Sequence, residues 1–109
     1  MLLAALGDAI GYKRGSWEFN LSGPSIHKEM MKLTENEGVL KLELNKRNFP
    51  YSDDTVMHFA TAKALLNGKT TDPLVSICQN MAKEYKACFK LMKGRAAGVT
   101  CQRAVDQLY

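Results

Sequence analysis

Apolar positions recur at helical spacing along most of the chain, and the resulting stripes predict a run of helices. Residues 2–10 are almost wholly apolar, which predicts a short helix that is buried on all sides. The loop that follows, residues 11–22, carries Trp17 and Glu18. Pro24 then suits the first turn of a second helix, which we expect to run to about Thr34 with apolar side chains on one face.

Three further helices are predicted in the second half of the chain. Residues 53–66 keep helical spacing and are followed by an Asn-Gly pair, a common end for a helix. An Asp-Pro pair at 72–73 supplies an N-cap candidate and a first-turn proline for the next helix, whose apolar stripe continues to residue 92. Thr100 is the predicted cap of the last helix.

The segment between the second and third helices is the least regular. Residues 40–44 alternate between apolar and polar side chains, which is also typical of a strand. A single strand has no pairing partner in this sequence, so we favour an extended loop over residues 35–50. The fold class predicted for the chain is therefore all-α, a helical, bundle-like arrangement.

Composition limits the classes of function. The 109 residues are enough for one small domain, and 46% apolar with 24% charged residues is ordinary for a globular protein. The net charge of +4 comes from scattered lysines and arginines, so we expect no nucleic-acid partner. No apolar run approaches the length of a membrane span, so we expect no membrane association. Three cysteines without CxxC spacing favour a reducing compartment, and we expect a cytoplasmic protein.

The most informative stretch is YSDDTVMH at residues 51–58. Ser52, Asp53 and Asp54 suit a helix start, where a hydroxyl caps a free amide and acids complement the helix dipole. The same oxygens are ligands that Mg²⁺ accepts. Adjacent helical side chains diverge by about 100°, so the two acids can serve two ions, but a second ligand cluster is then needed. Asp8, Glu18 and Asp106 are the local acids that remain as helpers, and both interpretations stay open.

Two other features carry weaker signals. Glu18 is either a solvated loop acid or a mobile acid that closes over a substrate, whereas His27 and His58 lack metal-ligand spacing and are expected to be packing or surface residues. The run GRAAGVT, residues 94–100, is either a plain helix connection or a small-residue loop that binds an anion through its amides.

Taken in order, three motifs resemble the amino-terminal part of the ADP-ribosyl-acceptor hydrolases, and within them the ADP-ribosylarginine hydrolases. They are GDAIGY at 7–12, SDDTVMH at 52–58 and GRA at 94–96, with WEF at 17–19 between the first two. The resemblance covers essentially the whole chain, 1–109, as the amino-terminal part of a single domain. It implies an all-α fold with two Mg²⁺ ions in a central cleft and hydrolysis of the N-glycosidic bond between ADP-ribose and arginine on proteins.

Carried over by position, the resemblance assigns roles to individual residues. Ser52, Asp53 and Asp54 would be metal ligands, Asp53 or Asp54 would take a proton from water, and Glu18 would lie in a flexible loop that contacts the substrate. The residues expected to line the diphosphate and ribose are Gly94, Ala96, Gly98, Val99 and Thr100.

The family has a second acidic metal-binding run near its carboxyl end, and this sequence has no counterpart to it. We therefore expect the chain to be an incomplete amino-terminal piece that is inactive alone, and the complete domain to be a monomer whose partners are ADP-ribose and ADP-ribosylated proteins. The alternative is a non-catalytic short form that binds ADP-ribose or a protein. An incomplete domain is also expected to expose an apolar patch.

Overall fold

A computed structural model describes residues 1–108, and every regular element within them is helical. The α-helices are α1 (Leu2–Tyr12), α2 (Gly23–Leu33), α3 (Asp53–Leu66), α4 (Leu74–Phe89) and α5 (Val99–Asp106), joined by two short 3₁₀ helices, η1 (Lys13–Gly15) and η2 (Val39–Lys41). The predicted all-α class is confirmed. The alternating residues 40–44 form no strand, and η2 occupies part of that segment instead. Within the described residues, each helix is too short or too polar to cross a lipid bilayer.

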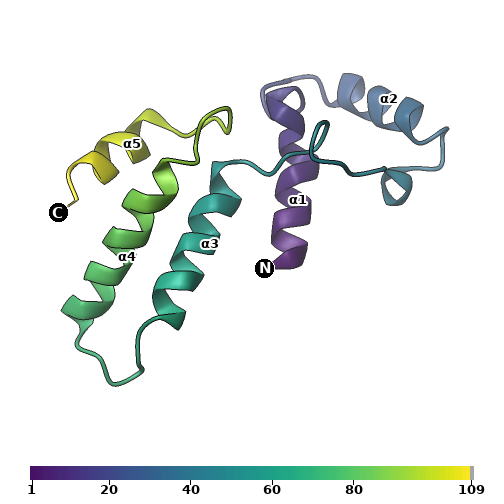
Figure 1. Cartoon of the computed structure of the whole chain (residues 1–109). Helices are drawn as coiled ribbons and strands as arrows, with labels where there is room; N and C mark the ends of the chain where they lie inside the picture. The colour runs from purple at the N-terminus through teal and green to yellow at the C-terminus, as the bar shows by residue number, and fades with distance from the viewer. Residues whose placement is uncertain (109) are drawn as a thin grey trace.

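The centre of the fold is a hairpin of α3 and α4 (Figure 1). Val56 and Ala60 on α3 pack against Cys88 on α4 and Met92 just beyond it, and all four are buried. The small side chain of Ala60 allows the two helices to approach closely. α5 packs on α4, and α1 stands on the other side of α3 (Figure 1). The hairpin thus holds the start of α3 between α1 and the loop that leads to α5.

The burial predicted for the first helix is wrong in this chain. Leu2 and Leu3 are 82% and 81% exposed, and Tyr12 is the only buried residue of α1. The apolar stripe of α1 extends all round the helix, whereas within residues 1–108 α3 is the only α-helix that packs substantially on it. The exposed apolar patch expected of an incomplete domain is therefore present.

Two predicted caps are also wrong. α5 begins after Gly98, so Thr100 lies inside its first turn and makes no cap hydrogen bond. Pro73 is itself the N-cap of α4, and the Asp72 carboxylate instead accepts a hydrogen bond from the amide of Lys69. Both differences arise because a nearby residue takes the extended backbone that precedes a helix: Pro73 directly after Asp72, and Gly98 two residues before Thr100.

The chain is more open than a domain of its length. Its radius of gyration is 17.0 Å, against about 13 Å for a compact domain of similar size. It measures 53 × 27 × 21 Å, with α2 at one end and the α4–α5 pair at the other (Figure 1). The residues predicted to be functional lie near the middle, where α1, α3 and the 94–98 loop meet.

Candidate functional site

Asp8, halfway along α1, fastens the start of α3. Its carboxylate accepts hydrogen bonds from the Ser52 amide at 2.8 Å, the Ser52 hydroxyl at 2.6 Å and the Thr55 hydroxyl at 2.5 Å. Ser52 is buried, and its hydroxyl oxygen also accepts a bond from the Asp54 amide at 3.2 Å. Ser52 is therefore the N-cap of α3, as its position predicts, and Asp8 orients that cap.

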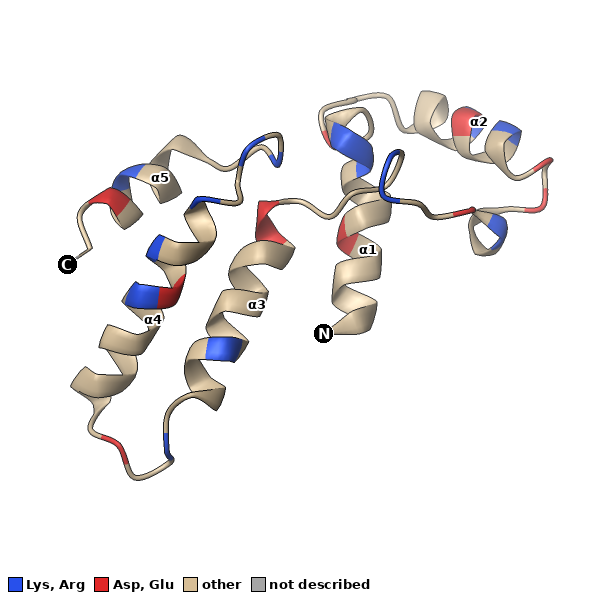
Figure 2. Cartoon of the chain, in the orientation of Figure 1, with Lys and Arg blue, Asp and Glu red and all other residues tan. Residues whose placement is uncertain are grey.

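The acid pair at the start of α3 is crowded by negative charge. Asp53 is half-buried and Asp54 is exposed. Burial, the neighbouring Asp54 and, more weakly, Asp8 raise the pKa of Asp53, although hydrogen bonds from backbone amides oppose this. Figure 2 shows acidic residues at the start of α3 and midway along α1, the two helices that stand side by side. The folded chain thus keeps like charges together, which costs free energy unless a cation joins them.

Glu18 belongs to the same acidic group. Its pKa is raised by partial burial and then by Asp53, Asp54 and Asp8. Electrostatic coupling of this kind requires the carboxylates to lie within reach of one another. Hydrogen bonds through Ser52 join Asp8 to the start of α3, and Glu18, on the loop after α1, feels the charges of these acids. Local spacing in the sequence could not connect these four acids. Asp106 stands apart from them, at the end of α5, where it accepts a hydrogen bond from Gln102.

The 94–98 loop is tied to this acidic group at two points. The Tyr12 hydroxyl donates to the Gly94 carbonyl at 2.9 Å, and the Asp53 amide donates to the Arg95 carbonyl at 3.1 Å. Arg95 also lies over the Tyr51 ring, with 4.1 Å between its guanidinium carbon and the ring centroid. Sequence reasoning missed Tyr12 and Arg95 as holders of the loop, because their partners are distant in the sequence.

The loop has an unusual backbone. Gly94 and Ala96 both have positive φ, 76° and 61°, and a side chain with a Cβ seldom adopts this conformation. Within residues 1–108, the amides of Ala96, Ala97 and Gly98 have no acceptor. Left-handed residues accompanied by free amides suit anion binding. Val99 and Thr100, the other predicted ligands, are exposed in the first turn of α5.

The histidines take no part in the acidic group. His27 on α2 and His58 on α3 are both exposed, and within the described chain no group of three or more His, Cys, Asp or Glu side chains is arranged to hold a metal ion. The histidines were predicted to be packing or surface residues, and the structure places both on the surface.

Comparison with known proteins gives this arrangement a family. A sequence profile of ADP-ribosylglycohydrolases matches residues 1–109. The chain belongs to the ADP-ribosylglycohydrolase family. ADP-ribosylhydrolase ARH1 of Dictyostelium discoideum is 44% identical over 106 residues, which are 97% of this chain and 26% of that relative. The chain thus spans about a quarter of the length of this relative, and the predicted family resemblance is confirmed.

The donors of this ADP-ribosylglycohydrolase chain fit a hard cation such as Mg²⁺ in their chemistry. All are oxygens, and the pKa of Asp53 is raised by burial and then by the charge of Asp54, both of which a bound cation would offset. The Ser52 hydroxyl donates to Asp8 and accepts from Asp54, which leaves one lone pair for an ion. Three side chains are a partial set of ligands, so further oxygens must come from water, substrate or other parts of the protein.

Proposed function

We propose that the whole protein is an Mg²⁺-dependent hydrolase that cleaves the N-glycosidic bond between ADP-ribose and arginine side chains of proteins. The observation that carries this proposal is the joint position of the acidic group and the 94–98 loop, which Tyr12 and Asp53 hold together. The acidic group suits a metal-assisted attack on the ribose, and the 94–98 loop suits binding of the diphosphate of the same ligand. Membership in the ADP-ribosylglycohydrolase family supports the substrate class.

Within this proposal, Ser52, Asp53 and Asp54 hold Mg²⁺. When bound, the ions supply positive charge that orients ribose hydroxyls and acidifies water. Asp53 or Asp54 takes the proton of the attacking water, and Asp53 is the less exposed of the two carboxylates. Negative charge from Asp54 and Glu18 stabilises the positive charge that develops on the ribose as the glycosidic bond breaks.

The diphosphate is assigned to the 94–98 loop and the start of α5. The free amides of Ala96 and Gly98 point to an anion-binding loop, and the first-turn amides at Val99 and Thr100 add the positive end of a helix dipole. No side-chain charge is needed for this contact, which fits a loop made mostly of glycine and alanine.

The negative charge of the acidic group supports arginine as the acceptor residue. An acidic group at the reacting end attracts a guanidinium leaving group and disfavours an acidic one. The experiment that tests this proposal uses two ADP-ribosylated peptides, one modified on arginine and one modified on serine. The release of ADP-ribose from each peptide by the whole protein is measured. We expect release from the arginine peptide with Mg²⁺ and none after chelation.

Matched variants sharpen this experiment. Asp53→Asn and Asp54→Asn should abolish release, whereas Asp106→Asn, an acid outside the acidic group, should leave it unchanged. Release that persists with chelator, or equal release from both peptides, contradicts the proposal. The 109-residue chain alone should release little or no ADP-ribose.

The second candidate function is a short form that binds ADP-ribose or a protein without hydrolysis. It is favoured by the exposed apolar residues and by the ordered 94–98 loop in this chain. The intact mass of the native product separates the two candidates. A species several times heavier than 12.1 kDa supports the hydrolase, and a native species of 12.1 kDa favours the short form. Titration of that short form with ADP-ribose, with and without Mg²⁺, then tests ligand binding.

A further inference from the structure

A three-residue contact joins the end of α1 to α2. The indole nitrogen of Trp17 donates to one carboxylate oxygen of Glu29 at 2.8 Å, and the Lys13 ammonium pairs with the other oxygen. The same ammonium lies 4.7 Å from the centroid of the Trp17 ring, and Trp17 is 6% exposed. Both oxygens of Glu29 therefore bind the segment that carries Glu18. We call this contact the Glu29 latch.

We propose that Glu29 is a positioning residue, which fastens residues 13–17 to α2 and thereby sets where Glu18 lies against Asp53 and Asp54. The contribution of Glu18 to hydrolysis rests on the function proposed above, whereas the latch itself does not. Within residues 1–108 the side chain of Glu29 hydrogen-bonds only Lys13 and Trp17, so it acts through the segment that it holds.

The backbone of residues 13–15 explains why a latch is needed. Lys13, Arg14 and Gly15 follow one another with φ of 39°, 54° and 84°. Two consecutive left-handed residues with side chains are costly, and they persist only where surrounding contacts enforce them. The turn continues through hydrogen bonds from the Phe19 amide to Gly15 and from the Asn20 amide to Trp17. Glu18 thus lies inside a strained turn and follows any movement of Trp17.

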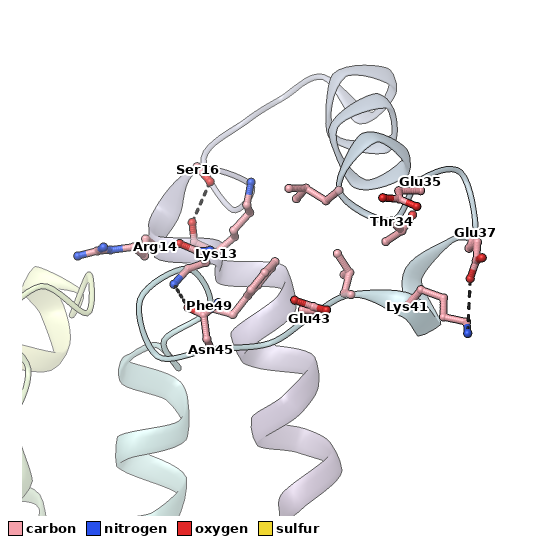
Figure 3. Close-up of a pocket in the computed structure, with 13 residues that line it drawn as sticks. Lys13, Arg14, Ser16, Thr34, Glu35, Glu37, Lys41, Glu43, Asn45 and Phe49 are labelled. Carbon is pink, nitrogen blue, oxygen red and sulfur yellow. Dashed lines mark hydrogen bonds and ion pairs between the residues drawn. The ribbon is translucent and has the colours of Figure 1, made fainter.

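On the side that faces α2, side-chain packing does not hold the turn in place. A cavity of about 770 Å³ separates the turn from the end of α2 and the segment after it. Figure 3 shows Lys13, Arg14 and Ser16 on one side of this cavity and Thr34, Glu35 and Glu37 on the other. Phe49 contacts Trp17 edge to face with 5.9 Å between the ring centroids, but Phe49 lies in the segment before α3, so this contact does not join the turn to α2. Among the described residues, Glu29 is the only α2 side chain that hydrogen-bonds the turn.

Fluorescence tests the latch directly, because Trp17 is the only tryptophan of the chain. Glu29→Gln keeps an oxygen for the indole but loses the charge that holds Lys13, and Glu29→Ala loses both. We expect a red shift of the emission and stronger iodide quenching, small in Glu29→Gln and larger in Glu29→Ala. The control is Glu37→Gln, which removes an exposed pair with Lys41 and leaves Trp17 untouched. Equal emission and quenching in all four proteins overturn the latch.

A double-mutant cycle tests the positioning of Glu18. In the whole protein, Glu29→Gln should lower kcat/KM for the ADP-ribosylated arginine peptide by about 3- to 30-fold, the range typical of coupled neighbours. In a Glu18→Gln background the same substitution should change nothing further, because the residue that it positions is already gone. An equal loss in both backgrounds shows a general structural effect and overturns the positioning role.

The fluorescence and kinetic experiments distinguish a failure of the latch from a failure of the proposed function. A wild-type protein with Mg²⁺-dependent hydrolysis but with no fluorescence response to Glu29→Ala contradicts the latch alone. A wild-type protein without hydrolysis contradicts the proposed function, and with it the catalytic reason for positioning Glu18, while the fluorescence result still decides the latch.

Discussion

At the scale of single residues, Asp8 connects α1 to the start of α3 in the candidate site. Three donors from the start of α3 converge on its carboxylate. Asp8→Asn replaces one acceptor oxygen with an NH₂ group that faces these donors, and an unsatisfied buried donor costs about 1–3 kcal/mol. We expect the free energy of unfolding to fall by that amount, as measured by urea denaturation followed by circular dichroism.

The control for this prediction is Asp106→Asn, which weakens one exposed hydrogen bond. Exposed substitutions of this kind usually change stability by less than about 0.5 kcal/mol. If the two variants unfold at the same urea concentration, Asp8 does not anchor α3.

Asp54 separates the capping role of the start of α3 from its metal-binding role. The backbone amide of Asp54, and not its side chain, bonds to Ser52. Asp54→Asn therefore keeps the cap, and the helix-dipole energy that it loses is partly offset by weaker repulsion of Asp53. We expect thermal stability close to wild type without Mg²⁺, and loss of any rise in Tm that Mg²⁺ produces.

Ser52→Ala provides the contrast, because it removes the cap and should cost about 1 kcal/mol already without Mg²⁺. An Mg²⁺-induced rise in Tm that is the same for Asp54→Asn and wild type would exclude Asp54 as a ligand.

The residue types of the site were predictable from sequence, but their connections were not. Ser52 is predicted as a cap from its position alone, and the structure confirms it. Its bond to Asp8 spans 44 positions, a contact that no local pattern encodes. The same holds for Tyr12 and Gly94, which lie 82 positions apart. Local spacing predicts what a side chain does within its own turn, whereas tertiary contacts determine which acids share a site.

At the scale of elements, the Glu29 latch makes the stability of the turn after α1 depend on pH. Hydrogen bonds from Lys13 and then from Trp17 lower the pKa of Glu29 below its ordinary value of 4.5. A carboxylate with a lowered pKa stabilises the fold above its unfolded pKa, and this contribution is lost as the pH falls through the folded pKa. The latch should therefore open on acidification below pH 4.5.

The comparison that checks this prediction is the free energy of unfolding of wild type and of Glu29→Gln across the acidic range. The wild type should be more stable near neutral pH, and the difference should shrink as the pH falls below 4.5. A difference that stays constant with pH would mean that the charge of Glu29 does not hold the turn.

Helical spacing of apolar residues predicted the five α-helices of the described chain. It was less informative about the residues at which these helices begin and end. The second helix begins as predicted, because Ser22 caps it and Pro24 occupies its first turn. The last helix begins earlier than the Thr100 cap predicted, because Gly98 takes the extended backbone that a helix start requires. Where several adjacent residues suit a cap, the path of the incoming chain selects one, and a local pattern carries no information about that path.

At the scale of the whole molecule, the exposed face of α1 connects the sequence, the shape and the family. The apolar residues 2–10 predict a buried helix, yet this chain exposes Leu2, Leu3 and Leu6. Two grooves flank α1, one lined by Phe59 and Leu91 and the other by Leu44 and Pro50. The relative is about four times as long as the aligned region, and the hydrolase proposed here needs further metal ligands. We therefore expect further helices of the whole protein to cover this face.

This expectation predicts different effects of one substitution in two settings. In the 109-residue chain, Leu2→Ser with Leu3→Ser removes exposed side chains, so it should reduce binding of a hydrophobic dye without lowering stability. In the whole protein the same pair should destabilise the fold, by about 1.5–3 kcal/mol for each apolar side chain that loses its burial. The control is Leu21→Ser, which removes a leucine that is 101% exposed in a loop and should be neutral in both settings. If Leu2 and Leu3 are also neutral in the whole protein, this face stays open, and the short binding form becomes the better account of the chain.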